Sequence, residues 1–404
     1  MRIYGKTLTE IFGLLPWAYK AVVTMGAAFF LFAVPYSLHY FITMGVQIDK
    51  VEPLNFPGLN REHNKGVMDP AIATDGSNVL MAHTVLSIDT LGTQQQVATE
   101  VVLERSTKPC KLWAFIGGGY KGEKDDVMGP DNVTPLSDTG GIWRYETPGI
   151  VYDPDDRGRE WKLYAYRYYW TGSEAFARHY GFIAEKTAPS PDGPWTDQRM
   201  LFSASKDQPG KPFEAEAMGQ TYINDLSPEL QDIYFYSRPS VVYNKFLFMT
   251  LSAFINKPGS PPDRIVMLKS VNHGKTWSYA GTPLRGSDLA KMGNYTKIGG
   301  ATLVKYNDKM YLAVVLGDKT ADGLGTFMIP FENPAQGLLA RDPKTGAPIV
   351  AQHHPRNSNQ PSRLGGGYTA YTDACSQGML TSEYSDLRAS FQIFKTYKKP
   401  ILSE

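Results

Sequence analysis

Short apolar or aromatic runs, separated by Gly, Pro, Asn and Asp, make up most of the chain after about residue 60. Runs such as KLYAYRYYW and KMYLAVVLG are rich in aromatic and β-branched residues and carry no long helical period. The residues between these runs are the ones that favour tight turns. The pattern predicts many short strands joined by turns, and it indicates an all-β fold.

One stretch near the N-terminus breaks this pattern. Residues 21–46 hold no charged side chain apart from the titratable His39, and a helix of about 20 apolar residues spans the roughly 30 Å hydrocarbon layer of a membrane. Arg2, Lys6 and Lys20 precede the stretch, so the positive-inside rule places the N-terminus in the cytoplasm. A cleaved signal peptide is the alternative, although its apolar core is usually shorter.

These two patterns give the predicted domain organisation. Residues 1–20 form a cytoplasmic and interfacial segment, 21–46 a transmembrane helix, 47–62 a linker and 63–404 a β-domain. The chain is then expected in the inner (cytoplasmic) membrane as a single-pass, N-in protein. Its C-terminal domain would lie in the periplasm or outside the cell.

The β-domain contains five segments that share one plan. Each opens with a short apolar strand after a small or proline-containing step, continues through a turn and ends in a second, aromatic-rich strand. The segments begin at Asp69, Thr147, Arg238, Gly300 and Gln377. Their spacing of about 60 to 90 residues suits four-stranded blades with insertions. The repeats therefore predict a five-bladed β-propeller preceded by one transmembrane helix.

Composition narrows the functional classes. The chain has 404 residues, 42% of them hydrophobic, and its 20% charged residues sum to a net charge of +1. This excludes extensive disorder, and the lack of a basic surplus argues against a nucleic-acid partner. An exported domain can oxidise its two cysteines, Cys110 and Cys375. One disulfide between the first and last blades and two separate buried thiols both remain open.

One turn between outer strands carries a recognisable pattern. Residues 270–277, SVNHGKTW, resemble the Asp-box turn of sialidase-type propellers, with Asn272 in place of the usual aspartate. The Asn272 side chain can still close the turn, and Trp277 is expected to pack between blades. This resemblance implies a structural turn.

Charged residues at three strand starts suggest chemistry. Asp69 precedes Pro70 in the first repeat, Glu146 precedes the Thr-Pro step of the second, and Arg238 precedes Pro239 in the third. Since the first strand of every blade lines the central funnel, these side chains are expected to face one axis. Two carboxyl groups that flank one bond are what glycoside hydrolysis requires.

The repeat plan, the Asp-Pro opening and the Glu-x-Pro motif resemble the five-bladed propeller glycoside hydrolases of the arabinanase, xylosidase and invertase group. The resemblance implies that Asp69 is the general base or nucleophile and Glu146 the general acid. Members of that group usually carry a third acidic residue on an intervening blade, and none stands in that register here. Candidates for it are Asp125, Asp126, Asp131, Asp138, Glu214 and Glu216.

Other side chains are expected to bind the substrate rather than to react. Arg238 could hold a hydroxyl or carboxylate group, and His83 lies on a strand that can face the funnel. Trp143 and Tyr166 offer rings on which the C–H faces of a sugar can stack. No cofactor or metal site is predicted, although Asp125, Asp126 and Asp131 could hold a structural Ca²⁺ through their oxygens.

The sequence thus predicts a membrane-anchored, exported glycoside hydrolase that acts on a cell-envelope or secreted poly- or oligosaccharide. The alternative is a non-catalytic propeller that binds glycan or protein, as a subunit of a polysaccharide synthesis or export assembly in the membrane. A sialidase-like enzyme is a third possibility. It fits less well because sialidases need three clustered arginines, and only Arg238 and Arg144 are suitably placed.

Overall fold

The computed structural model describes residues 2–3, 6–7, 51–54, 56, 64–91, 94–107, 113–121, 142–170, 181–203, 222–255, 261–319, 323–355, 369–372, 378–385 and 390–396. The chain divides into two compact units, Met1–Lys50 and Val51–Glu404. In the first unit, β1 (Arg2–Ile3) pairs antiparallel with β2 (Lys6–Thr7).

The transmembrane helix predicted over residues 21–46 lies outside the described residues. Among the helices that the structure does describe, none has the length and apolar composition that a bilayer crossing requires. The second unit begins with β3 (Val51–Pro53), inside the segment expected to be a linker.

The second unit is built from strands, and three of its sheets each come from one continuous part of the chain. The first contains β8 (Ile142–Tyr152), β9 (Trp161–Trp170), β10 (Gly181–Ala188) and β11 (Arg199–Ser203). The second contains β12 (Phe235–Asn244), β13 (Phe246–Phe254), β14 (Arg264–Ser270) and β15 (Ser278–Arg285). The third contains β16 (Lys297–Tyr306), β17 (Lys309–Gly317), β18 (Gly325–Asn333), β19 (Leu338–Leu339) and β20 (Gln352–Pro355).

The fourth sheet joins both ends of this unit and has eight strands. From the earlier part of the chain it contains β3, β4 (Asn64–Thr74), β5 (Asn78–Leu91), β6 (Gln94–Thr107) and β7 (Ala114–Phe115). From the C-terminal part it contains β21 (Thr369–Thr372), β22 (Gly378–Ser385) and β23 (Ser390–Thr396). The two parts meet where β23 pairs with β4 in parallel, at Phe391 and Gly66, and where β3 pairs antiparallel with β23.

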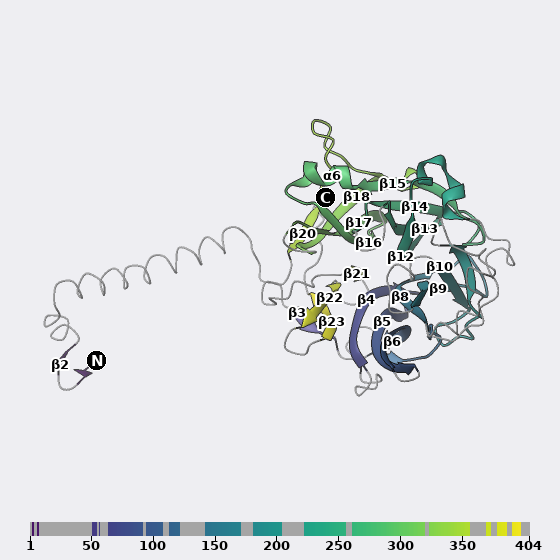
Figure 1. Ribbon diagram of the computed structural model, residues 1–404, viewed down its shortest axis with the longest axis horizontal. Coiled ribbons are helices and arrows are strands. Elements are labelled where there is room, and N and C mark those ends of the chain that lie inside the picture. Colours follow the sequence, from purple (N-terminus) through teal and green to yellow (C-terminus); the bar gives the residue numbers. More distant parts are fainter. Residues whose placement is uncertain are drawn as a thin grey trace. The chain divides into compact units, whose positions relative to one another are not determined.

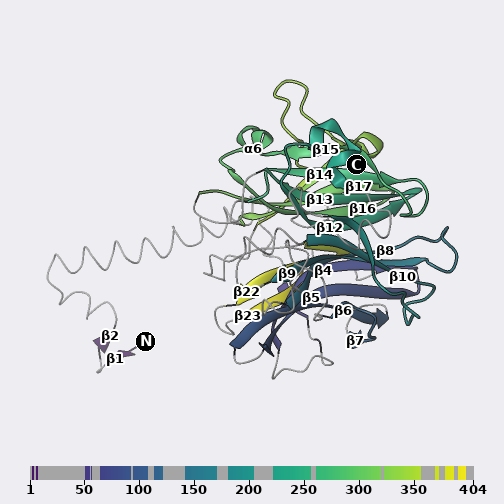
Figure 2. The same ribbon diagram turned by 45° about the vertical axis from the view of Figure 1, so that its right-hand side comes forward.

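The sheets are arranged around an axis as in a β-propeller (Figures 1 and 2). Around the ring, β4 contacts β8, β8 contacts β12, β12 contacts β16, β16 contacts β21, and β21 contacts β4. The propeller class predicted from the repeats is therefore confirmed. The predicted number of five separate blades is not confirmed, because the described strands form four large sheets and the C-terminal strands β21, β22 and β23 belong to the same sheet as β4–β7.

The four hairpins predicted from the first four repeats are present as β4–β5, β8–β9, β12–β13 and β16–β17. The second strand of each hairpin is buried between neighbouring sheets; in β13 and β17 every residue after the first is buried. Strands covered on both faces need apolar residues without alternation, which explains the continuous apolar runs in the sequence. In the fifth repeat the predicted first strand is β22, and β21 precedes it.

The core lies between the sheets rather than at the axis. One cluster joins the β8–β11 sheet to the β12–β15 sheet, a second joins β4–β6 to β8–β11, and a third joins β12–β15 to β16–β19. Helical segments are short: α6 (Gly286–Met292), η3 (Ile223–Leu226), η4 (Pro228–Leu230) and η5 (Pro334–Gln336). The first strands of the four hairpins, β4, β8, β12 and β16, contact one another in turn around the axis and are called the inner strands below. The cores that stabilise them lie between the sheets, and their backbones surround the axis.

Candidate active site at the inner strands

Three inner strands bend at the same kind of step. Asp69, Thr147 and Arg238 have positive φ angles of 54°, 51° and 62°, which are uncommon for residues other than glycine. Each precedes a proline, and each lies where the pairing with the next strand shifts by a bulge. Such a bulge re-aims the side chain at its position.

The shared register is therefore Asp69, Thr147 and Arg238, and not Asp69, Glu146 and Arg238 as the sequence suggested. Glu146 lies one residue before the bulge of β8. Its negative charge nevertheless acts on Asp69 and contributes to the raised pKa of that carboxyl group.

Asp69 is almost completely buried, with 2% of its surface exposed. Its backbone amide donates to the Ser382 hydroxyl of β22 at 3.4 Å. Within the described part of the chain, neither carboxyl oxygen has a hydrogen-bond partner of ordinary geometry. Beside Asp69, the Thr147 amide donates to the Thr84 hydroxyl at 3.0 Å, and both groups act on the Asp69 carboxyl group.

This environment makes the charged form of Asp69 unfavourable. Burial, and after it the negative charge of Glu146, raise the pKa of Asp69 from an ordinary value of 3.8 to about 7. The Arg238 guanidinium, the Thr84 hydroxyl and the Thr147 amide act in the opposite direction. Asp69 is therefore a carboxyl group that can hold a proton near neutral pH.

Glu146 has a different environment. It is only partly buried, and its Oε1 accepts a short hydrogen bond from the Tyr168 hydroxyl on the neighbouring strand β9. Burial and the Glu146 charge raise the pKa of Tyr168 well above its usual value of 10. Tyr168 therefore remains a hydrogen-bond donor throughout the physiological range.

Arg238 is the third of these residues and lies on β12. Its Nη1 donates to the Gly299 carbonyl of β16, and its charge lowers the pKa of Asp69. Arg238 thus joins the bulge of β12 to the next inner strand while it offsets part of the negative charge of the carboxyl pair.

Two cavities lie along the inner strands. The smaller, lined by Asp69, Thr147 and Arg238 among others, has a volume of about 20 Å³, which is room for about one water molecule. The larger has a volume of about 420 Å³ and is lined by later residues of the same four strands, including Tyr152 and Tyr243. A cavity of that size is within the range of small-molecule sites.

Two of the predicted substrate-binding residues, His83 and Trp143, lie in the core of the unit. His83 is fully buried, with its ring 4.7 Å from that of Phe56 and its Nε2 3.7 Å from Glu104. Trp143 is also fully buried, and the Arg167 guanidinium lies 4.0 Å from its ring centre. Neither ring can reach a substrate in this conformation.

Tyr166 comes nearer to the carboxyl pair. It is 6% exposed, lies opposite Glu146 in the β8–β9 pairing and stacks on Tyr168 with 5.0 Å between ring centres. Its contact with Tyr168 makes it a support for the donor to Glu146.

Four polar residues of the site were not found from the sequence. Thr147 had a signal, because the Thr-Pro step of the second repeat corresponds to the Asp-Pro and Arg-Pro steps of the first and third. Tyr168 had its place in the aromatic run 166–170 after the Glu146 strand, which suggested sugar stacking and not a bond to Glu146. Thr84 and Ser382 had no signal, since they come from other strands and meet the site only through the pairing of the sheets.

The residues described here hold no group of three or more His, Cys, Asp or Glu side chains that could bind a metal ion. Asp125, Asp126 and Asp131, the expected calcium ligands, lie outside the described residues, as do the other candidates for a third acidic residue. Cys110 and Cys375 also lie outside them.

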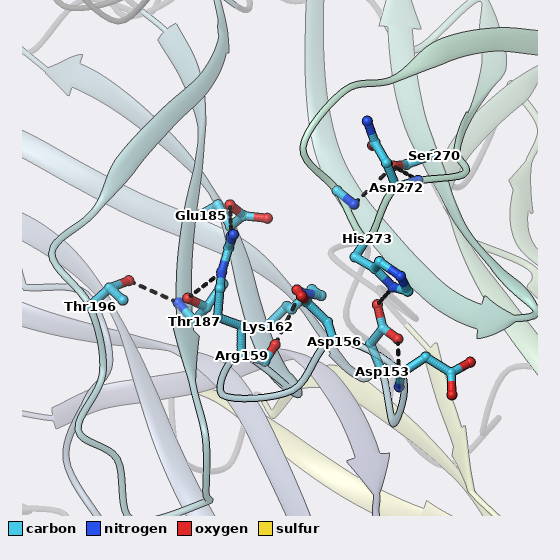
Figure 3. Close-up of polar contacts among 12 residues, drawn as sticks. Asp153, Asp156, Arg159, Lys162, Glu185, Thr187, Thr196, Ser270, Asn272 and His273 are labelled. Atoms are coloured by element: carbon cyan, nitrogen blue, oxygen red, sulfur yellow. Dashed lines mark hydrogen bonds and ion pairs between the residues drawn. The ribbon is translucent and has the colours of Figure 1, made fainter.

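A second polar cluster lies between two sheets, away from the carboxyl pair (Figure 3). In the turn after β14, Asn272 Oδ1 accepts from the Thr276 amide at 2.9 Å, and Ser270 Oγ accepts from the Gly274 amide at 2.8 Å. Trp277 packs edge-on against Tyr164 of β9. The turn predicted from residues 270–277 is thus present, and its tryptophan lies between the sheets as expected.

The same turn is tied to the β8–β11 sheet by charged groups (Figure 3). His273 Nδ1 lies 3.0 Å from Asp153 Oδ2. Arg199 donates to both Glu185 Oε2, at 2.6 Å, and the Gly274 carbonyl, at 3.0 Å. These contacts fix the packing of two sheets, and no substrate group is needed to explain them.

This fold and site geometry can be set beside those of known proteins. No model of a known protein family and no curated protein sequence matches the chain. Similar solved structures include a family 117 glycoside hydrolase of the marine bacterium Zobellia galactanivorans, with 12% identity, a TM-score of 0.49, and coverage of 86% of this chain and 90% of the other.

Two further similar structures are an arabinanase of Bacillus subtilis and a glycosyl hydrolase of Bacteroides ovatus. The first has 14% identity, a TM-score of 0.45 and coverage of 85% of this chain and 97% of the other. The second has 11% identity, a TM-score of 0.45 and coverage of 82% and 84%. With TM-scores below 0.5, these likenesses do not define what this chain does.

Proposed function

We propose that the chain is a glycoside hydrolase that acts on a poly- or oligosaccharide through Asp69 and Glu146. The observation that carries the proposal is that Asp69 and Arg238 line one small cavity between inner strands, and that the negative charge of Glu146 on the neighbouring strand acts on Asp69. Their environments differ, since Asp69 is almost completely buried and Glu146 is partly exposed and bonded to Tyr168. Two carboxyl groups in different environments are what acid–base hydrolysis of a glycosidic bond needs.

The experiment is a screen of the full-length purified protein against a panel of bacterial polysaccharides and oligosaccharides, with release of reducing ends as the readout. Asp69→Asn and Glu146→Gln should each lower the hydrolysis rate about 10²- to 10⁴-fold, the usual contribution of a general acid or base. Glu229→Gln is the matched control, because Glu229 is exposed on another part of the unit. Wild-type activity in both site variants would refute the assignment.

The second candidate function is a non-catalytic glycan- or protein-binding propeller of a polysaccharide synthesis or export assembly. Two observations favour it: the cavity beside Asp69 is far smaller than a sugar ring, and the 420 Å³ cavity at the later part of the inner strands carries Tyr152 and Tyr243. Isothermal titration of the same oligosaccharides would detect it. Binding that survives Asp69→Asn, without hydrolysis by the wild type, supports this function.

We also propose that β21, β22 and β23 correspond to a fifth blade that is fused to the first by the parallel pair at β4. The contacts of β21 with β16 and β4 support this, because they close the ring of inner strands. An experimental structure in which β4 and β23 are unpaired and splayed into separate sheets would support the five-bladed description. A continuous eight-stranded sheet would contradict it.

Finally, we propose that residues 21–46 anchor the protein in the inner membrane and that the propeller is exported. The support is the uncharged stretch and the positive residues before it. A reporter enzyme that is active only in the periplasm, fused after residue 404, should be active, whereas the same reporter fused after residue 20 should not. The reverse pattern would contradict an N-in orientation.

A further inference from the structure

The larger of the two cavities lies at the later residues of the inner strands. It has a volume of about 420 Å³, and its lining residues are 71–74, 149–152, 240–243, 302–305, 307 and 308. It adjoins the smaller cavity, since Ala71, Ser240 and Thr302 line both, but Asp69 lines the smaller one alone. Ala73 is four positions along β4 from Asp69, which is about 13 Å at the usual rise of a strand. The larger cavity is therefore a place separate from Asp69.

The wall of this cavity consists largely of strand edges. Ile150, Val241 and Leu303 line it although their side chains are buried in the cores between the sheets, so the cavity meets their backbone. β8, β12 and β16 each stand at the end of the strand order of their sheet, and β4 pairs with β23 at Gly66, before residues 71–74. In the part of the chain that the structure describes, each inner strand therefore has one edge outside the strand pairing at this level.

One contact shows which backbone groups of β16 lie at that edge. The Leu303 amide donates to the Ser240 hydroxyl of β12 at 2.9 Å, so Leu303 turns its backbone groups away from β17. Alternate residues of an antiparallel strand turn their N–H and C=O groups to the same side. Lys305 lies two residues further in an unbroken register with β17 and also lines the cavity. The edge of β16 thus supplies both hydrogen-bond donors and acceptors to the wall.

The side chains at this cavity add aromatic rings and no net charge. Tyr152 and Tyr243 are partly exposed, and the Tyr243 hydroxyl donates to Asp155. Lys305 and Asp308 are the only charged residues of the described lining, and Lys305 Nζ lies 3.4 Å from Asp308 Oδ1. Because these two charges offset each other, the lining favours a neutral ligand.

These features select a class of ligand. Hydroxyl groups both donate and accept hydrogen bonds, as a wall of open strand edges requires. Tyrosine rings present an apolar face beside a polar tip, which suits the C–H face and the hydroxyl groups of a sugar. A peptide strand would pair with one or two edges and leave the backbone groups of the others without partners. A neutral saccharide matches the whole wall better.

We propose that the 420 Å³ cavity is a binding site for the end of a short neutral saccharide, held by the open edges of the inner strands and by Tyr152 and Tyr243. The volume is within the range of small-molecule sites. Towards Asp69 the space narrows to room for about one water molecule, so a chain end fits and a continuous chain does not pass. The site is independent of the proposed hydrolysis and is compatible with either candidate function.

Isothermal titration of the full-length protein tests the class of ligand. The neutral probes are cellotriose, xylotriose and β-1,3-galactotriose, and at least one of them should bind. Asp69→Asn should bind that probe with an unchanged Kd. Tri-alanine and trigalacturonate, the peptide and anionic probes, should bind at least about tenfold more weakly. The proposal fails if no neutral probe binds, if Asp69→Asn abolishes binding, or if tri-alanine binds more tightly than every saccharide.

Two tyrosine variants test the location. Tyr243→Ala removes a ring at the cavity and should raise the Kd of the neutral probe about tenfold. Tyr279→Ala is the matched control, because both tyrosines pack against the same core and donate to a carboxylate, Asp155 in one case and Glu229 in the other. Tyr279 does not line the cavity, so its variant should keep the wild-type Kd. Equal losses in the two variants would overturn the location.

Hydrogen exchange places the ligand in the unmodified protein. With the neutral probe at saturation, the amides of residues 240–243 and 302–305 should exchange more slowly, and those of residues 378–385 should not change. Slowing confined to residues 66–70 and 378–385 would place the saccharide beside Asp69 and overturn the proposal. If the probe binds at the cavity and no sugar is cleaved, the site stands and the hydrolase fails. If sugars are cleaved and Asp69→Asn loses all binding, the hydrolase stands and this site fails.

Discussion

Asp69 combines two features that are unfavourable for an aspartate, a positive φ angle and a buried carboxyl group. Its φ of 54° is unusual for a residue with a side chain, and its buried carboxyl oxygens have no hydrogen-bond partner of ordinary geometry among the described residues. Thr147 and Arg238 adopt the same backbone conformation in the next two inner strands. Strained residues with unpaired polar atoms cluster at functional sites, and this repetition around the axis is what distinguishes the site from an ordinary turn.

The burial of Asp69 predicts a pH-dependent change in stability when it is replaced by Asn. Between about pH 4 and pH 7 the folded protein binds more protons than the unfolded chain, because the pKa of Asp69 is about 7 when folded and 3.8 otherwise. Stability therefore falls as the pH rises through this window, and the full difference, about 4 kcal/mol at most, is present above pH 7. Asp69→Asn does not titrate, so it should be more stable than the wild type at pH 8, and this advantage should shrink towards pH 4.

Urea unfolding of both proteins at pH 5 and pH 8 measures this effect. Asp192→Asn is the control, since Asp192 is 61% exposed at its side chain. An Asp69→Asn variant with the same stability difference at both pH values would show that Asp69 is solvated in the folded protein.

The sequence indicated some of the individual residues of the site. The Asp-Pro and Arg-Pro steps indicated Asp69 and Arg238, because proline fixes the backbone beside them. Glu146 was found through a three-residue motif, although its register relative to the bulge was wrong by one position. The hydrogen bond between Tyr168 and Glu146 could not be predicted, since it depends on which residues of β8 and β9 lie diagonally across the pair, and a shift of one residue would have turned Tyr168 away.

The sheets are held to one another by charged groups as well as by apolar cores. Glu185 of β10 is 2% exposed, and its Oε2 lies 2.6 Å from Arg199 Nη2 and 3.7 Å from Arg159 Nη2. Arg199 also donates to Gly274 in the turn after β14, so this one side chain joins two neighbouring sheets. The sequence revealed the turn but not this partner, because nothing in the spacing of Glu185, Arg199 and Gly274 indicates their proximity.

Replacement of Arg199 by Met should therefore destabilise the protein by about 3 kcal/mol. The substitution leaves the buried Glu185 carboxylate with only the more distant Arg159, and removal of one partner from a buried ion pair is strongly destabilising. Arg105→Met removes an exposed ion pair with Asp192 and should cost at most about 1 kcal/mol. Denaturant titration of the two variants measures the difference, and equal losses would mean that Glu185 is not effectively buried.

Over the whole second unit, the apolar runs and the repeat spacing were enough to predict a propeller. They were not enough to predict how the ring closes. In the fourth sheet the C-terminal strands join the earlier ones where β23 pairs in parallel with β4 and antiparallel with β3, and β3 lies within a segment whose polar and proline-containing sequence resembled a linker. Strand pairing between residues more than 300 positions apart leaves no local pattern, so only the three-dimensional arrangement reveals it.

The closure of the ring gives a prediction about truncation. Val51–Pro53 pairs with β23, the Leu54 amide donates to the Ile393 carbonyl at 2.9 Å, and Phe56 is buried against His83. A fragment of residues 58–404 lacks all three interactions, whereas a fragment of residues 51–404 retains them. Burial of one phenylalanine contributes about 2 to 3 kcal/mol and each hydrogen bond about 1 kcal/mol, so the shorter fragment should unfold several degrees lower.

The loss of β3 should first destabilise the strands that pair in the fourth sheet. Without β3, the amides of β23 should exchange faster with solvent than those of β13, which lies in another sheet and serves as the internal reference. Since the Asp69 amide donates to Ser382 of β22, loosening of β22 and β23 should also expose Asp69 to water and lower its pKa towards 3.8. Equal unfolding temperatures and equal exchange in the two fragments would show that the ring closes without β3.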